Sequence, residues 1–290
     1  MVVAAGCFDA FSARLAQLAG FRAIHMTGLG VEASQLGAPD LGLMSMTEIC
    51  GHAARMAEAT NIPILADIDT GFGGVLNVGR TIREMERAGI AGVHIEDQAL
   101  PKHCPLLAGR KVVGRGEAMD RLKAALDART DPDFVIVART DADTISFQEV
   151  IDRSNLFLEE GADLVMPVIM QVERQSYFNL PAEEQMEWAR RMIVAIDGPV
   201  MNMGGSPPPG YTTDDLADAG YAFTMYAASA LSAAANAIAD LFKTIHETGS
   251  DAAYWARNAG PYTSPLELMR AARLDAFAAI EERYSASLGD

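Results

Sequence analysis

Two carboxylates follow an apolar stretch of the chain at a spacing that suits a metal ion. Residues 64–66 are apolar, as in a buried strand, and Asp67 and Asp69 come next, before a glycine-rich turn. At a spacing of two on an extended chain, both side chains project to the same side. Close carboxylates raise each other's pKa unless a cation neutralises them, and oxygen ligands favour Mg²⁺ or Mn²⁺. The pair predicts a magnesium site, against the alternative of two capping aspartates in a surface loop.

A second acidic segment lies at 92–96, where an apolar stretch carries His94 and ends in Glu96. Polar residues also follow other predicted strands. Any one of these side chains is more often structural than catalytic, but together, at strand ends, they predict an active site. The set comprises Thr27, Gly28, Asp67, Asp69, His94, Glu96, Arg139, Asp141 and Asn202.

Eight strand–helix units are expected to position these side chains. The predicted strands lie at 2–5, 23–26, 63–67, 92–96, 134–138, 163–166, 200–203 and 221–225. The predicted helices lie at 9–19, 45–59, 77–88, 117–129, 147–160, 185–196, 213–219 and 227–248, with a long loop between residues 27 and 44. Buried strands that alternate with amphipathic helices predict an α/β protein with a parallel sheet.

The number of units favours one closed architecture. Eight units in about 250 residues predict a single (β/α)₈ barrel of the TIM type, whose active site lies at the C-terminal ends of the strands. The alternative is an open doubly wound sheet. A Gly-x-Gly-x-x-Gly turn after the first strand would support that alternative, and Thr27-Gly28-Leu29-Gly30 is too short to provide one.

Composition argues against two classes of partner. The 290 residues include 23 basic and 39 acidic side chains, so the net charge is 23 − 39 = −16, which disfavours nucleic acid and anionic membranes. We expect no signal peptide and no membrane span, because no suitable apolar run of about twenty residues occurs. Cys7, Cys50 and Cys104 lack the spacing of a disulfide framework or a zinc site. We therefore expect a reducing compartment, the cytoplasm.

Several motifs, in this order and over nearly all of the chain, resemble a known family. They are Gly6-Cys7-Phe8-Asp9-Ala10, Met26-Thr27-Gly28-Leu29-Gly30, Leu36-Gly37-Ala38-Pro39-Asp40-Leu41-Gly42, Asp67-Ile68-Asp69-Thr70-Gly71-Phe72-Gly73, His94-Ile95-Glu96-Asp97-Gln98, Lys102-His103-Cys104 and Ala138-Arg139-Thr140-Asp141-Ala142. The chain resembles the isocitrate lyase/phosphoenolpyruvate mutase superfamily, and within it the 2-methylisocitrate lyase-like and 2,3-dimethylmalate lyase-like branch.

The resemblance implies an architecture and an assembly. Residues 1–250 would form the catalytic barrel, and residues 251–290 would be a helical extension of the same domain. The resemblance implies that the final helix is exchanged with a neighbouring subunit, giving a homotetramer built as a dimer of dimers. Residues 251–290 do contain apolar side chains at helical spacing that need a surface to cover them, namely Leu266, Met269, Leu274, Phe277 and Ile280.

The resemblance also implies roles for site residues. Asp69 would hold Mg²⁺ directly, with Asp67 and Glu96 acting largely through water. A small 2-hydroxy or 2-oxo acid would be bound by Thr27, Gly28, Leu29 and Asp40, by Arg139 at a carboxylate, and by Asn202 at the distal end. The catalytic side chains would be Cys104 and Lys102 on a loop that closes over the substrate, together with Arg139 and His94.

These parts predict a carbon–carbon lyase. A 2-hydroxy acid whose hydroxyl is acidified by a metal ion breaks the adjacent bond in a retro-aldol step, which releases a 2-oxoacid and an enolate. Cys104 would protonate the enolate, although a single exposed cysteine is also explained as an incidental thiol. The alternatives are oxaloacetate decarboxylation or hydrolysis, a phosphonate mutase, and a binding protein without catalysis.

The chain departs from the family pattern on one side of the site. The closing loop usually reads Lys-Arg-Cys-Gly-His, but here His103, Pro105 and Leu106 replace three of those residues. Val168 stands where the family usually has a glutamate, and the segment 171–184 is longer than usual. The metal half of the site is therefore expected to be intact and the distal half to be rebuilt.

Overall fold

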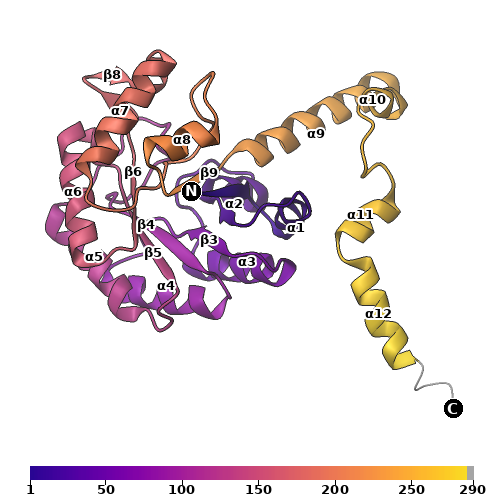
Figure 1. Ribbon diagram of the computed structural model, residues 1–290. Coiled ribbons are helices and arrows are strands. Elements are labelled where there is room, and N and C mark those ends of the chain that lie inside the picture. Colours follow the sequence, from indigo (N-terminus) through magenta and orange to yellow (C-terminus); the bar gives the residue numbers. More distant parts are fainter. Residues whose placement is uncertain (286–290) are drawn as a thin grey trace.

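A curled sheet of seven parallel strands forms the centre of the molecule in the computed structural model, which describes residues 1–285 (Figure 1). The strand order is β6-β5-β4-β3-β2-β1-β9. The strands are β1 (Val2–Cys7), β2 (Ile24–Met26), β3 (Ile64–Asp67), β4 (Gly92–Glu96), β5 (Val135–Thr140), β6 (Leu164–Pro167) and β9 (Phe223–Tyr226). A small antiparallel hairpin, β7 (Gln171–Val172) and β8 (Gln175–Ser176), stands apart from this sheet.

Helices surround the sheet on its outer side (Figure 1). Those of the body are α1 (Ala10–Leu18), α2 (Gly28–Leu36), α3 (Met46–Ala59), α4 (Val75–Arg87), α5 (Arg115–Ala128), α6 (Phe147–Glu160), α7 (Ala182–Ala195) and α8 (Thr213–Ala219), with short 3₁₀ turns η1 (Ala142–Thr144) and η2 (Tyr177–Asn179). The rest are α9 (Ser229–Thr248), α10 (Ala252–Arg257), α11 (Pro265–Ala271) and α12 (Leu274–Ser285).

Local capping explains why several helices begin where the sequence predicts. Asp9 accepts a hydrogen bond of 2.7 Å from the backbone N–H of Ser12 at the start of α1. Ser45 and Glu48 form the reciprocal pair of bonds that starts α3. Such bonds satisfy amide groups that the first turn leaves without a partner. The predicted N-cap of α1 at Asp9 is confirmed. Of the two residues considered for the start of α3, Ser45 is the N-cap.

Two apolar layers hold the helices and the sheet together. Alternate strand residues face outward and pack under the helices, among them Ile24, Ile64 and Ile136. A second cluster fills the inside of the curl, and it includes Leu65 and Met225. The interior of the curl is therefore packed with side chains, and the cavity described below lies at the ends of the strands.

The predicted strand at 200–203 is present only as two bridge residues. Val200 pairs with Val165 of β6, and Met201 pairs with Phe223 of β9, both in parallel. The Asn202 N–H donates to the Phe223 carbonyl at 2.8 Å. The segment is short because Pro199 precedes it and Gly204, at a φ of 96°, turns the chain away. The two edges of the sheet are thus connected, an arrangement consistent with the TIM type.

The prediction of a loop directly after Thr27 is wrong, because residues 28–36 form the helix α2. Gly28 and Gly30 suggested a loop, but close packing explains them. A Cβ atom at Gly30 would lie 2.6 Å from the Cβ of Phe8, and one at Gly28 would lie 2.7 Å from Oδ2 of Asp67. Both glycines therefore let the helix approach neighbouring elements, a constraint that only the folded chain reveals.

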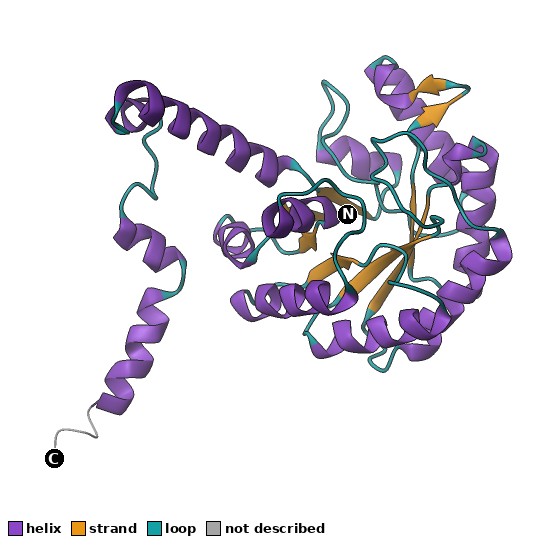
Figure 2. Cartoon of the chain, turned by 180° about the vertical axis from the view of Figure 1, so that it is seen from behind, coloured by secondary structure: helices purple, strands orange, loops and turns teal. Residues whose placement is uncertain are grey.

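The C-terminal helices α9–α12 form an arm that leaves the body (Figures 1 and 2). Two long side chains connect it back: Arg14 donates to the Ala271 carbonyl at 3.3 Å, and Arg273 donates to the Glu58 carbonyl at 2.7 Å. Many apolar side chains of the arm are exposed, including Ile238, Phe242, Leu266, Met269, Phe277 and Ile280. The exchange of a helix between subunits stays a prediction, and residues 286–290 of the predicted extension lie outside the described residues.

None of the helices within residues 1–285 has the length and apolar character that crossing a membrane requires.

Candidate active site

One cavity of about 290 Å³ lies at the C-terminal ends of the strands. It collects side chains from β2, β3, β4, β5 and the loops that follow them, as expected for a parallel sheet of this type. Of the predicted site residues, the cavity is lined by Thr27, Leu29, Asp40, Asp67, His94, Cys104 and Arg139.

Asp67 and Asp69 are adjacent, but not for the reason that the sequence suggested. Strand β3 ends at Asp67, and Asp69 has a φ of 49°, in the left-handed region that aspartate tolerates better than most residues. The Asp69 N–H donates to Oδ1 of Asp67 at 3.0 Å. The two carboxylates are thus held by a tight turn, and the alternation of an extended strand does not apply to them.

Lys102 neutralises part of this negative charge. Its ammonium lies 2.6 Å from Oδ1 of Asp69 and also pairs with Asp40. Burial disfavours the charged ammonium, but the charges of Asp69 and Glu96 outweigh burial and raise the pKa of Lys102. Lys102 is therefore positively charged at neutral pH and connects the closing loop to the acidic cluster.

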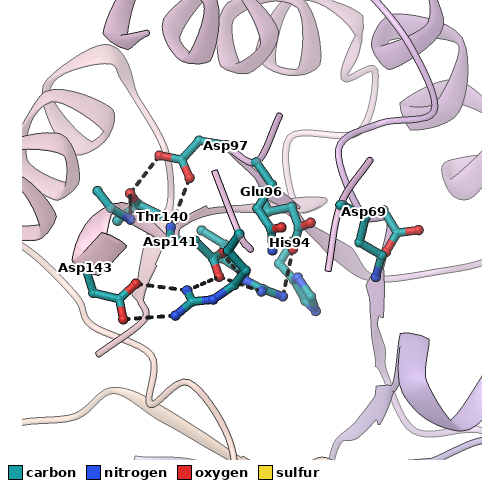
Figure 3. Close-up of polar contacts among 12 residues, drawn as sticks. Asp69, His94, Glu96, Asp97, Thr140, Asp141 and Asp143 are labelled. Carbon is teal, nitrogen blue, oxygen red and sulfur yellow. Dashed lines mark hydrogen bonds and ion pairs between the residues drawn. The ribbon is translucent and has the colours of Figure 1, made fainter. Parts of the chain in front are cut away.

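Glu96 is the most deeply buried carboxylate of the cluster, with 2% of its surface exposed, and Figure 3 shows it beside His94. Arg139 Nη1 lies 2.9 Å from its Oε2, yet within the described residues neither Glu96 oxygen takes part in a well-formed hydrogen bond. Burial raises the pKa of Glu96 well above its ordinary value, and burial together with the charge of Asp67 raises the pKa of Asp69 to about 6. Burial and the closeness of like charges therefore disfavour the ionised forms of Glu96 and Asp69.

This donor set matches a hard divalent cation in its chemistry. Asp67, Asp69 and Glu96 offer carboxylate oxygens, and the unsatisfied oxygens of Glu96 are available to a ligand. The side chains are not preassembled, however: no group of three or more His, Cys, Asp or Glu residues within 1–285 is arranged to hold a metal ion as it stands. The magnesium site therefore stays a prediction that the chemistry of the residues supports.

A pair of buried histidines lies directly beneath Asp67. The Nε2 atoms of His25 and His94 are 2.8 Å apart, and the rings are nearly parallel, at 13°. Burial, followed by the neighbouring His94, lowers the pKa of His25 to about 3, and burial also lowers the pKa of His94. Both rings are neutral at pH 7, so a single proton lies between them.

The surroundings decide which histidine donates that proton. His94 Nδ1 lies 3.7 Å from Oδ1 of Asp67. Because that carboxylate is negatively charged, it favours an N–H group at Nδ1 over a lone pair. His94 then accepts at Nε2 from the Nε2–H of His25. The sequence predicted His94 but not His25, whose only signal is a histidine inside an apolar strand.

Arg139 is engaged by neighbouring carboxylates. Its Nε and Nη2 donate to Asp141 at 2.8 and 3.1 Å, while Nη1 faces Glu96. Asp97 in turn accepts from the Thr140 hydroxyl at 2.7 Å and from the Asp141 N–H at 2.9 Å (Figure 3). The fork that was predicted to bind a substrate carboxylate is thus held by Asp141, and the guanidinium lines the cavity from that position.

The loop that carries Cys104 contributes Cys104, Pro105 and Leu106 to the wall of the cavity. The Cys104 N–H donates to the Asp40 carbonyl at 3.2 Å. Farther along the loop, Arg110 Nη1 donates to Asp141 at 2.8 Å and to Asp143 at 2.9 Å. Burial raises the pKa of the Cys104 thiol, so it is protonated at neutral pH. Arg110 was not singled out from the sequence, where its position in a basic stretch indicates only a solvated loop.

Two predicted binding residues do not line this cavity. Asn202 lines a neighbouring cavity of about 140 Å³, and its Nδ2 donates to the Thr224 hydroxyl at 3.1 Å. Gly28 contributes space beside Asp67, as described above. The backbone of Asn202 remains bonded to the sheet, and its side chain is directed to Thr224 and the neighbouring cavity.

The other end of the main cavity is apolar. Met166 and Val168 come from β6 and its end, and Met203 and Met225 come from the opposite edge of the sheet. The segment 171–184 forms the β7–β8 hairpin and η2, and it brings Phe178 to the cavity. No spacing pattern in the sequence singles out Phe178, since its contact with the site depends on how the hairpin folds back.

Comparisons with known proteins show what this chain is similar to. The family described as phosphoenolpyruvate phosphomutase matches residues 1–246. The 2,3-dimethylmalate lyase of Eubacterium barkeri is 39% identical over 246 residues, which cover 84% of this chain and 81% of that protein. The 2-methylisocitrate lyase of Escherichia coli (strain K12) is 36% identical over 247 residues, which cover 84% of this chain and 80% of that protein.

A solved structure with the same fold is oxaloacetate acetylhydrolase in complex with the inhibitor 3,3-difluorooxalacetate. It is 29% identical to this chain and superimposes with a TM-score of 0.85, covering 98% of this chain and 92% of the other.

Proposed function

Because the chain belongs to the phosphoenolpyruvate mutase/isocitrate lyase superfamily and is a lyase, we propose that it cleaves a carbon–carbon bond of a substituted malate- or isocitrate-like 2-hydroxy acid. The products are a 2-oxoacid and a carboxylate. One observation carries the proposal: the carboxylates of Asp40 and Asp67 line the same cavity as Cys104, whose thiol is protonated. Each of these parts serves one half of a retro-aldol reaction.

The reaction breaks the bond between C2 and C3 of the substrate. The hydroxyl proton leaves to a basic group at the charged end of the cavity, and the electrons of the O–H bond form the C2 carbonyl. The electron pair of the broken bond passes to C3, which becomes an enolate. The Cys104 thiol then gives its proton to C3, and Lys102 keeps the loop closed through Asp40 and Asp69.

Mg²⁺, with Mn²⁺ as the alternative ion, would be held by Asp69, Asp67 and Glu96. When bound, such an ion acidifies the hydroxyl group and stabilises negative charge on oxygen. His94 orients Asp67 for this role, and His25 orients His94. Thr27, Gly28, Leu29 and Asp40 would bind the acid at the cavity wall, and Arg139 would add positive charge next to its carboxylate.

A turnover screen tests this function. Malate, 2,3-dimethylmalate, 2-methylisocitrate and isocitrate are incubated with the protein and Mg²⁺, and the released 2-oxoacid is detected. We expect turnover of at least one substituted malate and no turnover after chelation of divalent ions. Turnover that survives complete chelation contradicts the metal assignment, and the absence of any 2-oxoacid contradicts the lyase assignment.

A second candidate is oxaloacetate decarboxylation or hydrolysis, with a phosphonate mutase on the same scaffold as a further variant. It is favoured by the structural similarity to an oxaloacetate acetylhydrolase and by the replacement of the residues around Cys104 with His103, Pro105 and Leu106. Release of CO₂ or oxalate from oxaloacetate at a rate above that of hydroxy-acid cleavage would decide for this candidate.

We further propose that the arm α9–α12 mediates a homotetramer in which C-terminal helices are exchanged around closed (β/α)₈ barrels. The support is the exposed apolar surface of the arm, which a second copy of the chain would cover. Light scattering at micromolar concentration should give the mass of a tetramer, whereas a monomer would contradict the proposal. The unpaired thiols of Cys7, Cys50 and Cys104 support a reducing compartment, so the proposed location is the cytoplasm.

A further inference from the structure

We propose that the distal part of the substrate is an uncharged hydrocarbon group. On the proposed lyase function, on which this inference rests, the preferred substrate is a malate-type 2-hydroxy acid that carries an alkyl or aryl substituent on C3. A further carboxylate in that position, as in isocitrate, is excluded.

The positive charges of the cavity are all at one end, and all are already paired. Lys102 contacts Asp40 and Asp69, and Arg139 contacts Glu96 and Asp141. Arg139 lines the cavity itself. Lys102 does not line it, but its partner Asp40 does. Arg110 does not line the cavity, and it is likewise paired with Asp141 and Asp143. In the part of the chain that the structure describes, no cation remains to pair with a carboxylate at the distal end.

The distal wall is formed by apolar side chains. Its lining residues are Met166, Val168, Met170, Phe178, Met203 and Met225. Ser206 contributes a hydroxyl group, and Gly204 and Gly205 complete the lining on that side. A hydroxyl group can hydrogen bond to a carboxylate, but it cannot neutralise its charge.

The loop that carries Cys104 adds apolar side chains next to the position proposed for the reacting carbon. Pro105 and Leu106 follow Cys104 directly, and both line the cavity. The group that protonates the departing carbon is therefore flanked by hydrocarbon. A substituent on that carbon meets apolar surface on the side of the loop as well as on the side of the strands.

The apolar wall is anchored by specific bonds, so it is a built feature of the site. The Met170 N–H donates to Oδ2 of Asp143 at 2.8 Å, and the Tyr177 N–H donates to the Met170 carbonyl at 2.9 Å. The buried Tyr177 hydroxyl donates to the Gln185 carbonyl at 2.9 Å. These contacts fix the backbone on either side of Met170 and immediately before Phe178. The segment 171–184 thus contributes Phe178 to the wall and holds Met170 beside it.

The binding free energies expected for an alkyl substituent and for a carboxylate at this wall differ strongly. Each methylene group moved from water into an apolar site improves binding by about fourfold. A carboxylate moved to the same place without a partner loses its hydration and gains no compensating ion pair, which lowers binding by at least about a hundredfold. Methionine side chains adapt to the shape of a substituent, so we expect tolerance of several alkyl shapes.

A binding measurement on the wild-type protein with Mg²⁺ tests the inference without turnover. The probes are 2-oxohexanoate and 2-oxoglutarate, which present an alkyl chain and a carboxylate, respectively, at the distal end. Calorimetric titration should give at least about a hundredfold tighter binding of 2-oxohexanoate. Equal binding, or tighter binding of 2-oxoglutarate, overturns the inference. This result does not depend on which bond the enzyme breaks.

A kinetic series then connects binding to catalysis. With malate, 3-methylmalate, 3-propylmalate and isocitrate as substrates, kcat/KM should rise by about tenfold from methyl to propyl and fall by at least about a hundredfold from propyl to isocitrate. No turnover of any member, together with the expected binding preference, contradicts the lyase function and leaves the inference standing. Turnover that favours isocitrate overturns the inference and leaves the lyase function standing.

A matched pair of variants locates the effect. Met170→Lys adds a cation at the apolar wall and should narrow the preference for 2-oxohexanoate over 2-oxoglutarate by at least about tenfold. Met170→Gln adds polarity of similar size without charge and should leave most of the preference. If both variants change the preference equally, charge at this wall is not what selects the substrate, and the inference is wrong. Circular dichroism of both variants verifies that they are folded.

Discussion

The two ends of the cavity differ in both chemistry and construction. The charged end is formed where β3, β4 and β5 finish, and it carries Asp67, Glu96 and Arg139. The apolar end combines Met166 of β6 and Met225 of β9 with residues outside the sheet, among them Met170 and Phe178. The molecule therefore places the proposed reacting groups and the proposed substrate-selecting groups at opposite ends of one cavity.

Backbone pairing explains why the reacting groups are on strands. Asp67 is the register partner of His94, and Glu96 is the register partner of Arg139, so parallel hydrogen bonding sets the distances between these side chains. Loops have no such register, and their side chains can be changed without disturbing the sheet. The apolar end is therefore expected to tolerate substitution more readily than the charged end.

The largest effect is expected from removal of an inner carboxylate. Asp69→Ala should abolish Mg²⁺ binding and lower the rate by about 10⁴-fold or more, since it removes the proposed direct ligand of the ion. Asp67→Ala and Glu96→Ala should cost less, because they act through water. Calorimetric titration with Mg²⁺ and initial rates provide the measurement. Equal losses in all three variants would break the distinction between direct and indirect ligands.

The next largest effect concerns the loop. Cys104→Ser should lower carbon–carbon cleavage by about 10³-fold while binding of a 2-oxoacid is preserved, because serine is similar in size but a far weaker acid. Single-turnover kinetics should follow the 2-oxoacid and CO₂ separately. A serine variant that keeps most of its rate would favour decarboxylation, in which the remaining enolate takes its proton from water.

A smaller effect is expected beneath the charged end. His25→Phe removes the donor that fixes the proton of His94 and should weaken Mg²⁺ binding and activity by about tenfold. His25→Gln keeps a donor at this position and should restore most of the loss. Metal titration of both variants separates this positioning role from a packing role, since a packing defect would affect the two alike.

The smallest effect is expected for a charge pair outside the cavity. Arg115 Nη2 lies 2.5 Å from Glu149, and its side chain is 44% exposed. Arg115→Gln should lower the free energy of unfolding by about 0.5 kcal/mol at pH 7 and leave kcat unchanged, because exposed pairs are screened by water. Urea unfolding monitored by circular dichroism provides the measurement, and a change in kcat would contradict the separation of this pair from the site.

The same pair has a defined pH dependence. The hydrogen bond from Arg115 lowers the pKa of Glu149 to about 2, below its unfolded value. A lowered pKa in the folded state stabilises the protein above the unfolded pKa, and this contribution is lost as the pH falls toward 2. The difference between wild type and Arg115→Gln should therefore be constant above about pH 5 and shrink below it. A difference that grows on acidification would contradict this sign.

The sequence by itself determined the elements whose signals are local. Strand β4, helix α6 and helix α8 have the predicted bounds, 92–96, 147–160 and 213–219, because periodicity and capping act within a few residues. The positions of Asp67, His94, Cys104 and Arg139 around one cavity also followed from the sequence, since parallel strands end at one edge. The family resemblance, carried by contiguous motifs, was confirmed by the comparisons.

Only the tertiary structure decided the features that depend on distant contacts. The helix α2 forms because Gly28 and Gly30 allow close approach to Asp67 and Phe8, a fact that the local pattern of a loop conceals. The segment at Val200 is reduced to bridge residues because it must fit between two strand edges. Three further contacts require the completed fold: His25 meets His94, Asn202 lines a second cavity, and Phe178 lines the main cavity. Local propensity acts over a few residues, whereas these contacts join side chains that only packing of the whole chain brings together.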